Sequence, residues 1–337
     1  MTKLKIFFVI AMLTFASILT GCGSSTSGHN KTVAVCFPNT TPSWERNGSA
    51  LQKYLEEDGF TVDMKISSTS DEQVAQVVEA IKTKPGCVVV GAIDSSAFAK
   101  ALDETKSYNV PIIAFDRIIF GTDAVTYYAS YDNDAVGEAQ ALYFETVLNL
   151  RNGGGPYNIE FFAGGTTDNN SHIFLRNIMK IFDPYLRNGQ LVCRSGQTDF
   201  DAVTVKDWYA ENARPRIKEL LSKYYNGETL HVIISPNDEI AGVILDEFQK
   251  AGRPLPLICG LDADPAALDR IRNGLQTFTV AKDPAVLTLK CFRMVKAVVD
   301  GTVPDINDVK TYDNGVKIVP AYLCTPQIID KSNIQDF

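Results

Sequence analysis

Short apolar runs alternate with stretches of helical periodicity along nearly the whole chain. The apolar runs predict strands at 32–37, 60–66, 86–91, 110–115, 125–130, 157–163, 190–195, 230–235, 256–261 and 277–281. The stretches between them predict helices near 43–58, 71–83, 95–107, 133–150, 169–187, 202–225, 238–251, 264–273 and 284–300. Strands that alternate with helices predict parallel sheets with right-handed crossovers, and therefore an α/β fold.

Two stretches of the chain repeat one plan of strand, helix and strand. The first begins with CVVVGAID at Cys87 and ends at Asp116 and Arg117, and the second begins with LHVIISPND at Leu230 and ends at Asp262. In parallel sheets covered on both faces, ligands bind outside the carboxyl ends of the strands. Two lobes that face each other would therefore form a cleft lined by polar strand ends. These residues are Asp94, Asp116, Arg117, Asn237, Asp238 and Asp262.

Some of these acidic residues have a simpler explanation as helix caps. Asp94, Asp238 and Asp264 each stand just before a predicted helix, where a carboxylate caps free backbone amides, and Asp132 is either a cap or part of a hinge. On this interpretation Asn237 faces the ligand while Asp238 caps the helix. Charges at buried strand ends, as at 116–117 and 262, are costly unless they are paired or bound to a ligand.

The first residues of the chain predict an export signal. Lys3 and Lys5 precede a mostly apolar stretch at 6–19, and Leu-Thr-Gly-Cys follows at 19–22. This pattern predicts a lipoprotein signal peptide at 1–21, because a membrane span needs ~20 predominantly apolar residues. Cys22 would then carry the lipid anchor, and 22–31 would form a flexible tether. The sequence therefore predicts an extracytoplasmic protein anchored to the membrane by lipid.

Length, charge and cysteine content narrow the class of protein. Even without its first 21 residues, the chain of 337 exceeds the ~250 to 300 residues at which a single core stops growing, so two lobes are expected. The net charge of −8 disfavours nucleic acid as a partner. The six cysteines besides Cys22 lie mostly in apolar runs, which favours buried free thiols. Three separated histidines offer no metal-site spacing, and RNGGGP at 151–156 is a turn before a strand, so no metal or cofactor is predicted.

The two tryptophans, together with the polar strand ends, suggest a sugar as the ligand. Trp44 and Trp208 stand in polar company just after strand-like runs. A monosaccharide offers hydroxyl groups to carboxylates, amides and cationic groups, and an apolar C–H face to an aromatic ring. Ordinary packing at the edge of a lobe is the alternative explanation for both rings. A glycosidase would also pair carboxylates in a sugar cleft, but we expect Arg117 and Lys282 to keep the carboxylates ionised, which favours a binding protein without catalytic residues.

Ordered motifs carry a resemblance to a known family. They are FDR at 115–117, Tyr-Asp-Asn at 131–133, Gly-Gly-Thr-Thr-Asp-Asn-Asn at 164–170, Ser-Pro-Asn-Asp at 235–238, Gly-Leu-Asp-Ala-Asp at 260–264, Thr-Val-Ala-Lys-Asp at 279–283 and KTYDNGVKIVPAYL at 310–323. From about Thr32 to Pro326 the chain resembles the type I periplasmic sugar-binding proteins, in the xylose-binding and ChvE-type multiple-monosaccharide-binding branch. The resemblance implies two doubly wound parallel-sheet lobes joined by a three-strand hinge.

The resemblance also implies which residues contact the sugar. The implied ligand-binding residues are Trp44, Asp116, Arg117, Asn170, Trp208, Asn237, Asp262 and Lys282, with Arg46 and Asp168 as weaker candidates. The chain departs from the family pattern at two positions. Ser43 stands where relatives often have a basic residue, a role that Arg46 could take, and Leu261 replaces a common glutamine.

The lobes are expected to be discontinuous in sequence. The N-terminal lobe would comprise 32–130 and 283–317, and the C-terminal lobe 131–282 and 318–337, with crossings near 130–132, 281–283 and 316–319. The resemblance implies a monomer that captures an aldopyranose by closing its lobes and delivers it to the permease of an ABC importer, to a chemosensory or two-component receptor, or to both. A furanose, polyol, quorum signal or nucleoside is the alternative ligand. Neither the sugar nor the choice between transport and sensing follows from the sequence.

Overall fold

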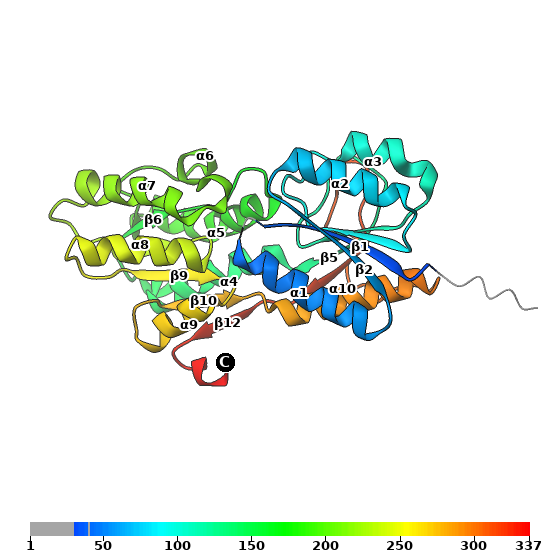
Figure 1. Ribbon diagram of the computed structural model, residues 1–337. Helices are drawn as coiled ribbons and strands as arrows, with labels where there is room; N and C mark the ends of the chain where they lie inside the picture. Colours follow the sequence, from blue (N-terminus) through cyan, green and yellow to red (C-terminus); the bar gives the residue numbers. More distant parts are fainter. Residues whose placement is uncertain (1–29, 40) are drawn as a thin grey trace, which may run out of the picture.

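The computed structural model describes residues 30–39 and 41–337 (Figure 1). The predicted signal peptide, Cys22 and the tether up to residue 29 lie outside the described residues. No helix in 30–39 or 41–337 is both long enough and apolar enough to cross a membrane. The six cysteines in these ranges are free, and five of them are buried, while Cys193 is half-buried.

The first lobe is built on a six-stranded parallel sheet with the strand order β11-β5-β4-β3-β1-β2. Its strands are β1 (Thr32–Pro38), β2 (Thr61–Ser67), β3 (Cys87–Val90), β4 (Ile112–Phe115), β5 (Val125–Tyr131) and β11 (Ala321–Cys324). Its helices are α1 (Pro42–Glu57), α2 (Ser70–Lys82), α3 (Ala99–Thr105) and α10 (Pro284–Val299). Figure 1 shows this lobe in blue and cyan, with α10 in orange.

The second lobe repeats the plan with the strand order β12-β10-β9-β8-β6-β7, in which only β12 runs antiparallel to its neighbour. Its strands are β6 (Tyr157–Phe161), β7 (Leu191–Val192), β8 (Val232–Ile234), β9 (Leu257–Leu261), β10 (Phe278–Ala281) and β12 (Gln327–Asp330). Its helices are α4 (Asn133–Val147), α5 (Asn169–Arg187), α6 (Phe200–Val203), α7 (Arg214–Glu219), α8 (Asp238–Lys250) and α9 (Pro265–Arg272).

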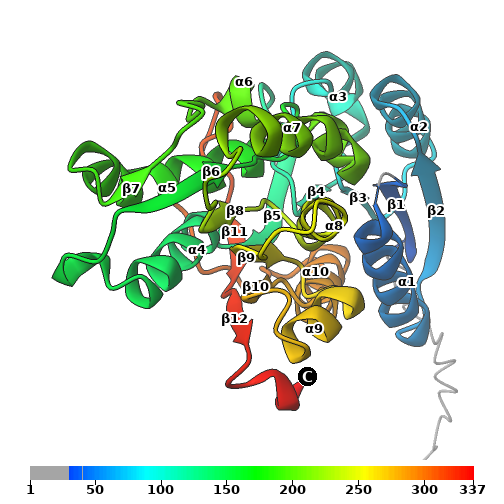
Figure 2. The same ribbon diagram turned by 90° about the vertical axis from the view of Figure 1, so that its left-hand side faces the viewer.

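Each sheet is covered by helices on both faces, as Figures 1 and 2 show. Along β1, Val33, Val35 and Phe37 pack into one apolar cluster, whereas Ala34 and Cys36 pack into another on the opposite face. Two further clusters flank the second sheet in the same way. Strands buried on both faces explain why the strand sequences read as continuous apolar runs. The predicted fold class of two parallel α/β lobes is confirmed.

The prediction of one helix over 202–225 is wrong. The segment contains the end of α6, two short turns of 3₁₀ helix at Lys206–Trp208 and Ala210–Ala213, α7, and one π-helical turn at Leu220–Tyr224. Asp207 and Trp208 both have a left-handed backbone with φ of 58°, which no α-helix accommodates. Pro215 then stands in the first turn of α7, where proline is well tolerated.

The predicted third crossing, near 316–319, is also wrong. Strand β11 was not predicted, and it pairs in parallel with β5 at the edge of the first sheet. Burial of Val319 and Ala321 in the core of the first lobe holds residues 318–324 there, so the chain crosses only between β11 and β12. The other two passages between the sheets follow β5 and β10.

Candidate ligand-binding site between the lobes

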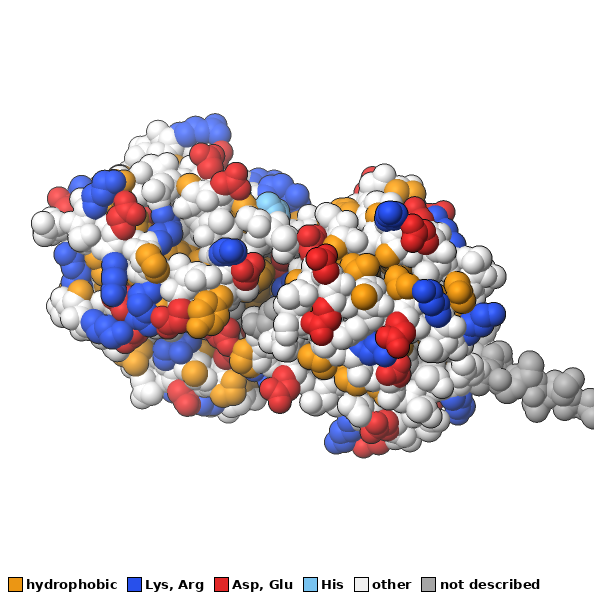
Figure 3. Space-filling model, turned by 45° about the horizontal axis from the view of Figure 1, so that its top comes forward, with side chains coloured by type: hydrophobic (Ala, Val, Ile, Leu, Met, Phe, Trp, Pro, Cys, Tyr) orange, Lys and Arg blue, Asp and Glu red, His pale blue; other side chains and the backbone are white. Residues whose placement is uncertain are grey.

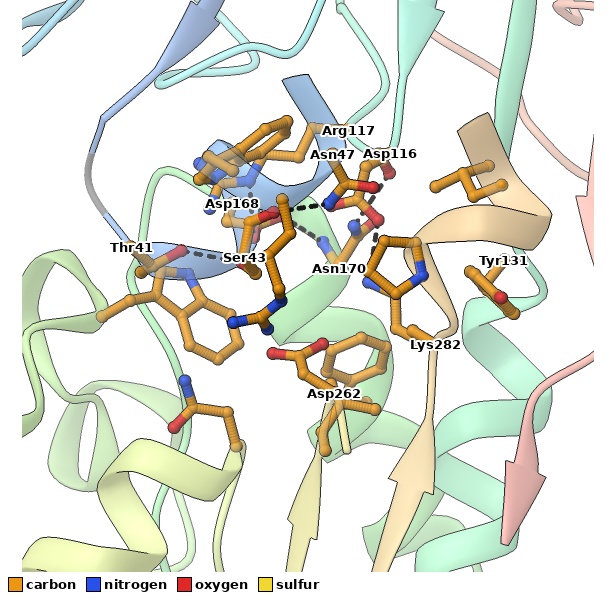
Figure 4. Close-up of a pocket in the computed structure, with 18 residues that line it drawn as sticks. Thr41, Ser43, Asn47, Asp116, Arg117, Tyr131, Asp168, Asn170, Asp262 and Lys282 are labelled. Atoms are coloured by element: carbon orange, nitrogen blue, oxygen red, sulfur yellow. Dashed lines mark hydrogen bonds and ion pairs between the residues drawn. The ribbon is translucent and has the colours of Figure 1, made fainter. Parts of the chain in front are cut away.

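A cavity lies between the two lobes, at the carboxyl ends of their parallel strands (Figure 4). All ten residues predicted to bind the ligand line it, and their contact with a ligand stays a prediction. The cavity is also lined by eight residues that were not predicted to bind the ligand, namely Thr41, Ser43, Asn47, Tyr131, Phe174, Leu261, Pro284 and Leu287. Proximity to predicted residues could have identified some of them, since Thr41, Ser43 and Asn47 surround Trp44 in the chain.

Asp116 directly follows β4 and has a left-handed backbone with φ of 60°. Its carbonyl oxygen accepts hydrogen bonds from Tyr128 Oη at 2.6 Å, Ser130 Oγ at 2.9 Å and Asn170 Nδ2 at 2.9 Å. These donors compensate a conformation that costs ~1 to 2 kcal/mol in an ordinary residue. The Asp116 carboxylate therefore has a fixed direction toward the cavity, where Oδ1 lies 2.7 Å from Lys282 Nζ of the other lobe.

Lys282 supplies a positive charge at the centre of the site. Burial by itself would lower the pKa of this ammonium group, but the charges of Asp116 and Asp262 outweigh burial and raise the pKa. The group is therefore a permanent hydrogen-bond donor at neutral pH.

Arg117 and Asp168 form a second ion pair between the lobes. Arg117 Nε lies 2.9 Å from Asp168 Oδ2, and both side chains are buried. Arg117 Nη1 also donates to the carbonyl oxygens of Ala92 at 3.0 Å and Ile93 at 3.2 Å. Burial raises the pKa of the Asp168 carboxyl, and the charge of Arg117 opposes that rise. Asp168 also caps α5, because its Oδ1 accepts from the backbone amide of Asn170 at 2.9 Å.

Asp262 follows β9 in a strained turn. Asp262 and Ala263 have left-handed backbones with φ of 91° and 54°. Burial raises the pKa of Asp262 to about 6, against the opposing charge of Lys282. Desolvation therefore outweighs the nearby positive charge at Asp262, although we expected Arg117 and Lys282 to keep the carboxylates ionised. The carboxyl is still mostly ionised at pH 7.

Each tryptophan lies against a glycine just beyond the end of a strand. A Cβ atom on Gly91, after β3, would lie 2.4 Å from Trp44 Cζ3, and one on Gly164, after β6, would lie 2.1 Å from Trp208 Cζ2. Trp44 also packs edge-on against Phe37 in the first core, with 5.3 Å between ring centroids. Packing therefore explains part of the position of Trp44, although both rings also line the cavity.

The predicted roles of several acidic residues need correction. Asn237, not Asp238, caps α8, because its Oδ1 accepts from the amide of Ile240 at 2.9 Å. Asp238 is fully buried, and its carboxylate accepts three hydrogen bonds from other residues of the second lobe. Asp264 precedes α9 but makes no side-chain cap bond, and its Oδ1 instead accepts from Arg46 Nη2 of the other lobe at 2.5 Å.

Two other acidic residues are placed by short local contacts. Asp132 Oδ1 accepts from the amide of Ala135 at 3.0 Å and caps α4. Asp94 Oδ1 accepts from the amide of Ser96 at 2.8 Å, in a turn outside the cavity lining. The contact of Asp132 agrees with its interpretation as a helix cap, whereas the prediction that Asp94 caps a helix is wrong, because α3 begins only at Ala99.

Three ion pairs thus join the lobes across the cavity, namely Asp116 with Lys282, Arg117 with Asp168, and Arg46 with Asp264. A backbone hydrogen bond from Ser95 N to the carbonyl oxygen of Thr167, at 3.2 Å, adds to them. The structure therefore represents a closed arrangement of the lobes.

On the face of the molecule shown in Figure 3, acidic and basic side chains are interspersed instead of gathering into one basic patch.

Comparison with known proteins gives consistent matches along the chain. A family model described as "Periplasmic binding protein domain" matches residues 33–302. The multiple sugar-binding periplasmic protein SbpA of Azospirillum brasilense is 34% identical over 96% of this chain and 92% of its own length. The multiple sugar-binding periplasmic receptor ChvE of Rhizobium radiobacter is 34% identical over 90% of this chain and 88% of its own length.

Solved structures of similar fold are also solute-binding proteins. An ABC transporter solute-binding protein from Clostridium phytofermentans with bound β-D-glucose has a TM-score of 0.87 and 33% identity, over 90% of this chain and 95% of that one. A carbohydrate transporter solute-binding protein from Chloroflexus aurantiacus in complex with D-glucose has a TM-score of 0.82 and 25% identity, over 91% and 94%.

Proposed function

The chain belongs to the periplasmic binding protein family, and from that membership we propose that it captures a monosaccharide, an aldopyranose, between its lobes. The family places the protein outside the cytoplasm and among binding proteins instead of enzymes. The relatives that are about one-third identical are named for binding several sugars or were solved with glucose. These names support a sugar as the ligand of this chain.

The observation that carries the proposal is the chemical composition of the cavity. The lining combines two indole rings with carboxylates, amides and three cationic groups. A sugar hydroxyl both donates and accepts hydrogen bonds, so a site that excludes water must present both kinds of partner. The rings offer flat apolar surfaces for the C–H faces of a pyranose. We propose sugar contacts for Trp44, Arg46, Asp116, Arg117, Asp168, Asn170, Trp208, Asn237, Asp262 and Lys282.

Closure of the lobes around the sugar would give a membrane partner a distinct shape to recognise. The ion pairs of Arg117 with Asp168 and of Arg46 with Asp264 join side chains of opposite lobes, so ligand contacts that bridge the lobes favour the closed form together with them. We propose that the closed form is recognised by the permease of an ABC sugar importer, by a sensor receptor, or by both. The relatives include both a transporter solute-binding protein and a protein named as a receptor.

The decisive experiment is a ligand screen of the purified protein. Thermal shift across aldoses, polyols, furanoses and nucleosides, followed by calorimetry, should identify an aldopyranose as the tightest ligand. Asp262→Ala should weaken that binding ~tenfold to over a hundredfold, because a charge-assisted hydrogen bond contributes ~1.5 to 3 kcal/mol. Asp269→Ala is the matched control, because Asp269 lies on α9 with an exposed side chain. The proposal fails if no aldose binds, or if nitrophenyl glycosides are hydrolysed.

The anchor is a separate proposal that rests on the sequence at Cys22. Replacing Cys22 with serine should abolish labelling by a radioactive fatty acid and release the protein from the membrane fraction. Sugar affinity of the purified variant should equal that of the parent, because every residue that lines the cavity lies between Thr41 and Leu287 in the chain. Unchanged labelling of the serine variant would contradict the assignment of the lipidation site.

A further inference from the structure

Asp238 is a fully buried carboxylate that lies behind the cavity and is not among its lining residues. Its Oδ1 accepts from Gln276 Nε2 at 2.7 Å. Its Oδ2 accepts from Thr279 Oγ1 at 2.9 Å and from the backbone amide of Asp264 at 3.0 Å. Both oxygens are therefore occupied by donors from three segments, namely the turn after β9, the loop before β10, and β10 itself.

These contacts support the strained turn at 262–264. Two consecutive non-glycine residues with left-handed backbones, Asp262 and Ala263, cost ~1 to 2 kcal/mol each, so the turn needs support from outside. Asp238 holds the amide of Asp264 directly. It also orients Thr279, because the Thr279 hydroxyl donates to Asp238 and leaves an oxygen lone pair for the amide of Ala263 at 3.4 Å.

The turn presents two side chains with different tasks. Asp262 lines the cavity, and Asp264 pairs with Arg46 of the other lobe. We propose that Asp238 is a positioning residue that couples sugar recognition to lobe closure, because by holding one turn it directs Asp262 to the sugar and Asp264 to Arg46. This inference rests on the proposed function of the cavity.

The surroundings of Asp238 are specific for a carboxylate. Arg270 Nε donates to Gln276 Oε1 at 2.9 Å, which fixes the amide of Gln276 with its NH₂ group toward Asp238. An asparagine at 238 would place an NH₂ group against one of three donors. Gly260 leaves the space that the carboxylate needs, because a Cβ atom there would lie 1.8 Å from Asp238 Oδ1.

The test is a mutant cycle measured by calorimetry with D-glucose. In the parent background, Asp238→Asn should weaken glucose binding at least about tenfold, because one buried donor loses its acceptor. In a background that already carries Asp262→Ala and Arg46→Ala, the same substitution should change affinity less than about twofold, since both side chains that it positions are gone. An equal loss in both backgrounds would overturn the inference. Asp269→Asn on α9 serves as the control and should leave affinity unchanged.

A second pair of variants covers the case in which Asp238→Asn does not fold. Thr279→Val removes the hydroxyl that links Asp238 to Ala263 and keeps the side-chain shape, whereas Thr279→Ser keeps the hydroxyl. The valine variant should weaken glucose binding at least about fivefold and change the glucose-to-xylose affinity ratio, and the serine variant should do neither. Equal affinities of folded valine and serine variants would also overturn the inference.

The outcomes separate this inference from the proposed function. If the parent protein binds none of the aldoses, the proposed function fails, and the inference that rests on it is overturned as well. If the parent binds glucose and Asp238→Asn weakens binding equally in both backgrounds, the sugar site stands and the coupling role of Asp238 is refuted.

Discussion

Lowering the pH should weaken sugar binding through Asp262. Burial raises the pKa of this carboxyl from an ordinary 3.8 to about 6, while Lys282 opposes the rise and Asp264 and Asp116 add to it. A hydroxyl of the sugar donates to a carboxylate but meets a competing donor in a carboxylic acid. We therefore expect the ionised form of Asp262 to bind the sugar and the protonated form to bind it poorly.

The expected change in the dissociation constant follows from the fraction of Asp262 that is ionised. With a pKa of about 6 for Asp262, that fraction is roughly 90% at pH 7 and roughly 10% at pH 5. The dissociation constant should therefore rise about tenfold between these pH values. Stability of the ligand-free protein should change in the opposite sense. A carboxyl with a raised pKa binds more protons in the folded than in the unfolded state, so its contribution to stability improves as pH falls from above 6 toward 4.

Comparison with Asp262→Asn isolates the effect, because asparagine does not titrate. Calorimetry with D-glucose at pH 7, 6 and 5 should give a steep profile for the parent and a flatter one for the variant. Burial also raises the pKa of Asp238, to about 7, but Asp238 titrates in both proteins and largely cancels from the comparison. Parallel profiles for the two proteins would refute the assignment of Asp262 as the ionised acceptor.

Two further predictions concern the stacking ring and the inter-lobe ion pair. Gly164→Ala should displace the indole of Trp208, because the new Cβ would lie 2.1 Å from the ring, and should weaken glucose binding about tenfold by calorimetry. Gly48→Ala, whose Cβ would make only ordinary contacts with Phe37 at 3.6 Å and Met64 at 3.9 Å, should leave affinity unchanged, and equal effects of the two variants would contradict this role of Gly164. Arg46→Ala should weaken binding less than about fivefold, because its side chain is 36% exposed and its pair with Asp264 is screened. That difference from the parent should shrink as salt is raised, and a loss independent of salt would assign Arg46 another role.

The sequence predicted the positions of the cavity residues better than their individual contacts. A polar residue that ends an apolar strand run must emerge at the edge of a parallel sheet, which is why Asp116, Asn237 and Asp262 all line the cavity. The choice between neighbouring residues depends on the backbone direction. Asn237 and Asp238 are both good capping residues, and only the structure shows that Asn237 caps α8 while Asp238 points into the protein.

Other errors arose where tertiary contacts override local pattern. The stretch 202–225 has helical composition, but the close packing of Trp208 on Gly164 accompanies a left-handed backbone that interrupts the helix. Strand β11 is only four residues long and carries no pattern that distinguishes one lobe from the other. Its place at the edge of the first sheet depends on pairing with β5, a partner almost two hundred residues earlier in the chain.

The two lobes use the same local device to prepare their halves of the site. In each lobe an indole lies on a glycine just beyond a strand, and an aspartate after another strand has a left-handed backbone supported by hydrogen bonds. Such strained residues keep one direction only while their surroundings hold them, and Tyr128 and Ser130 hold Asp116 from within its own lobe, so we expect each half of the site to be largely arranged before the lobes meet. Closure then needs to change mainly the distance between two rigid halves. Selectivity among sugars should therefore reside in the fixed directions of Asp116 and Asp262, whereas the overall affinity should also depend on how readily the inter-lobe ion pairs form.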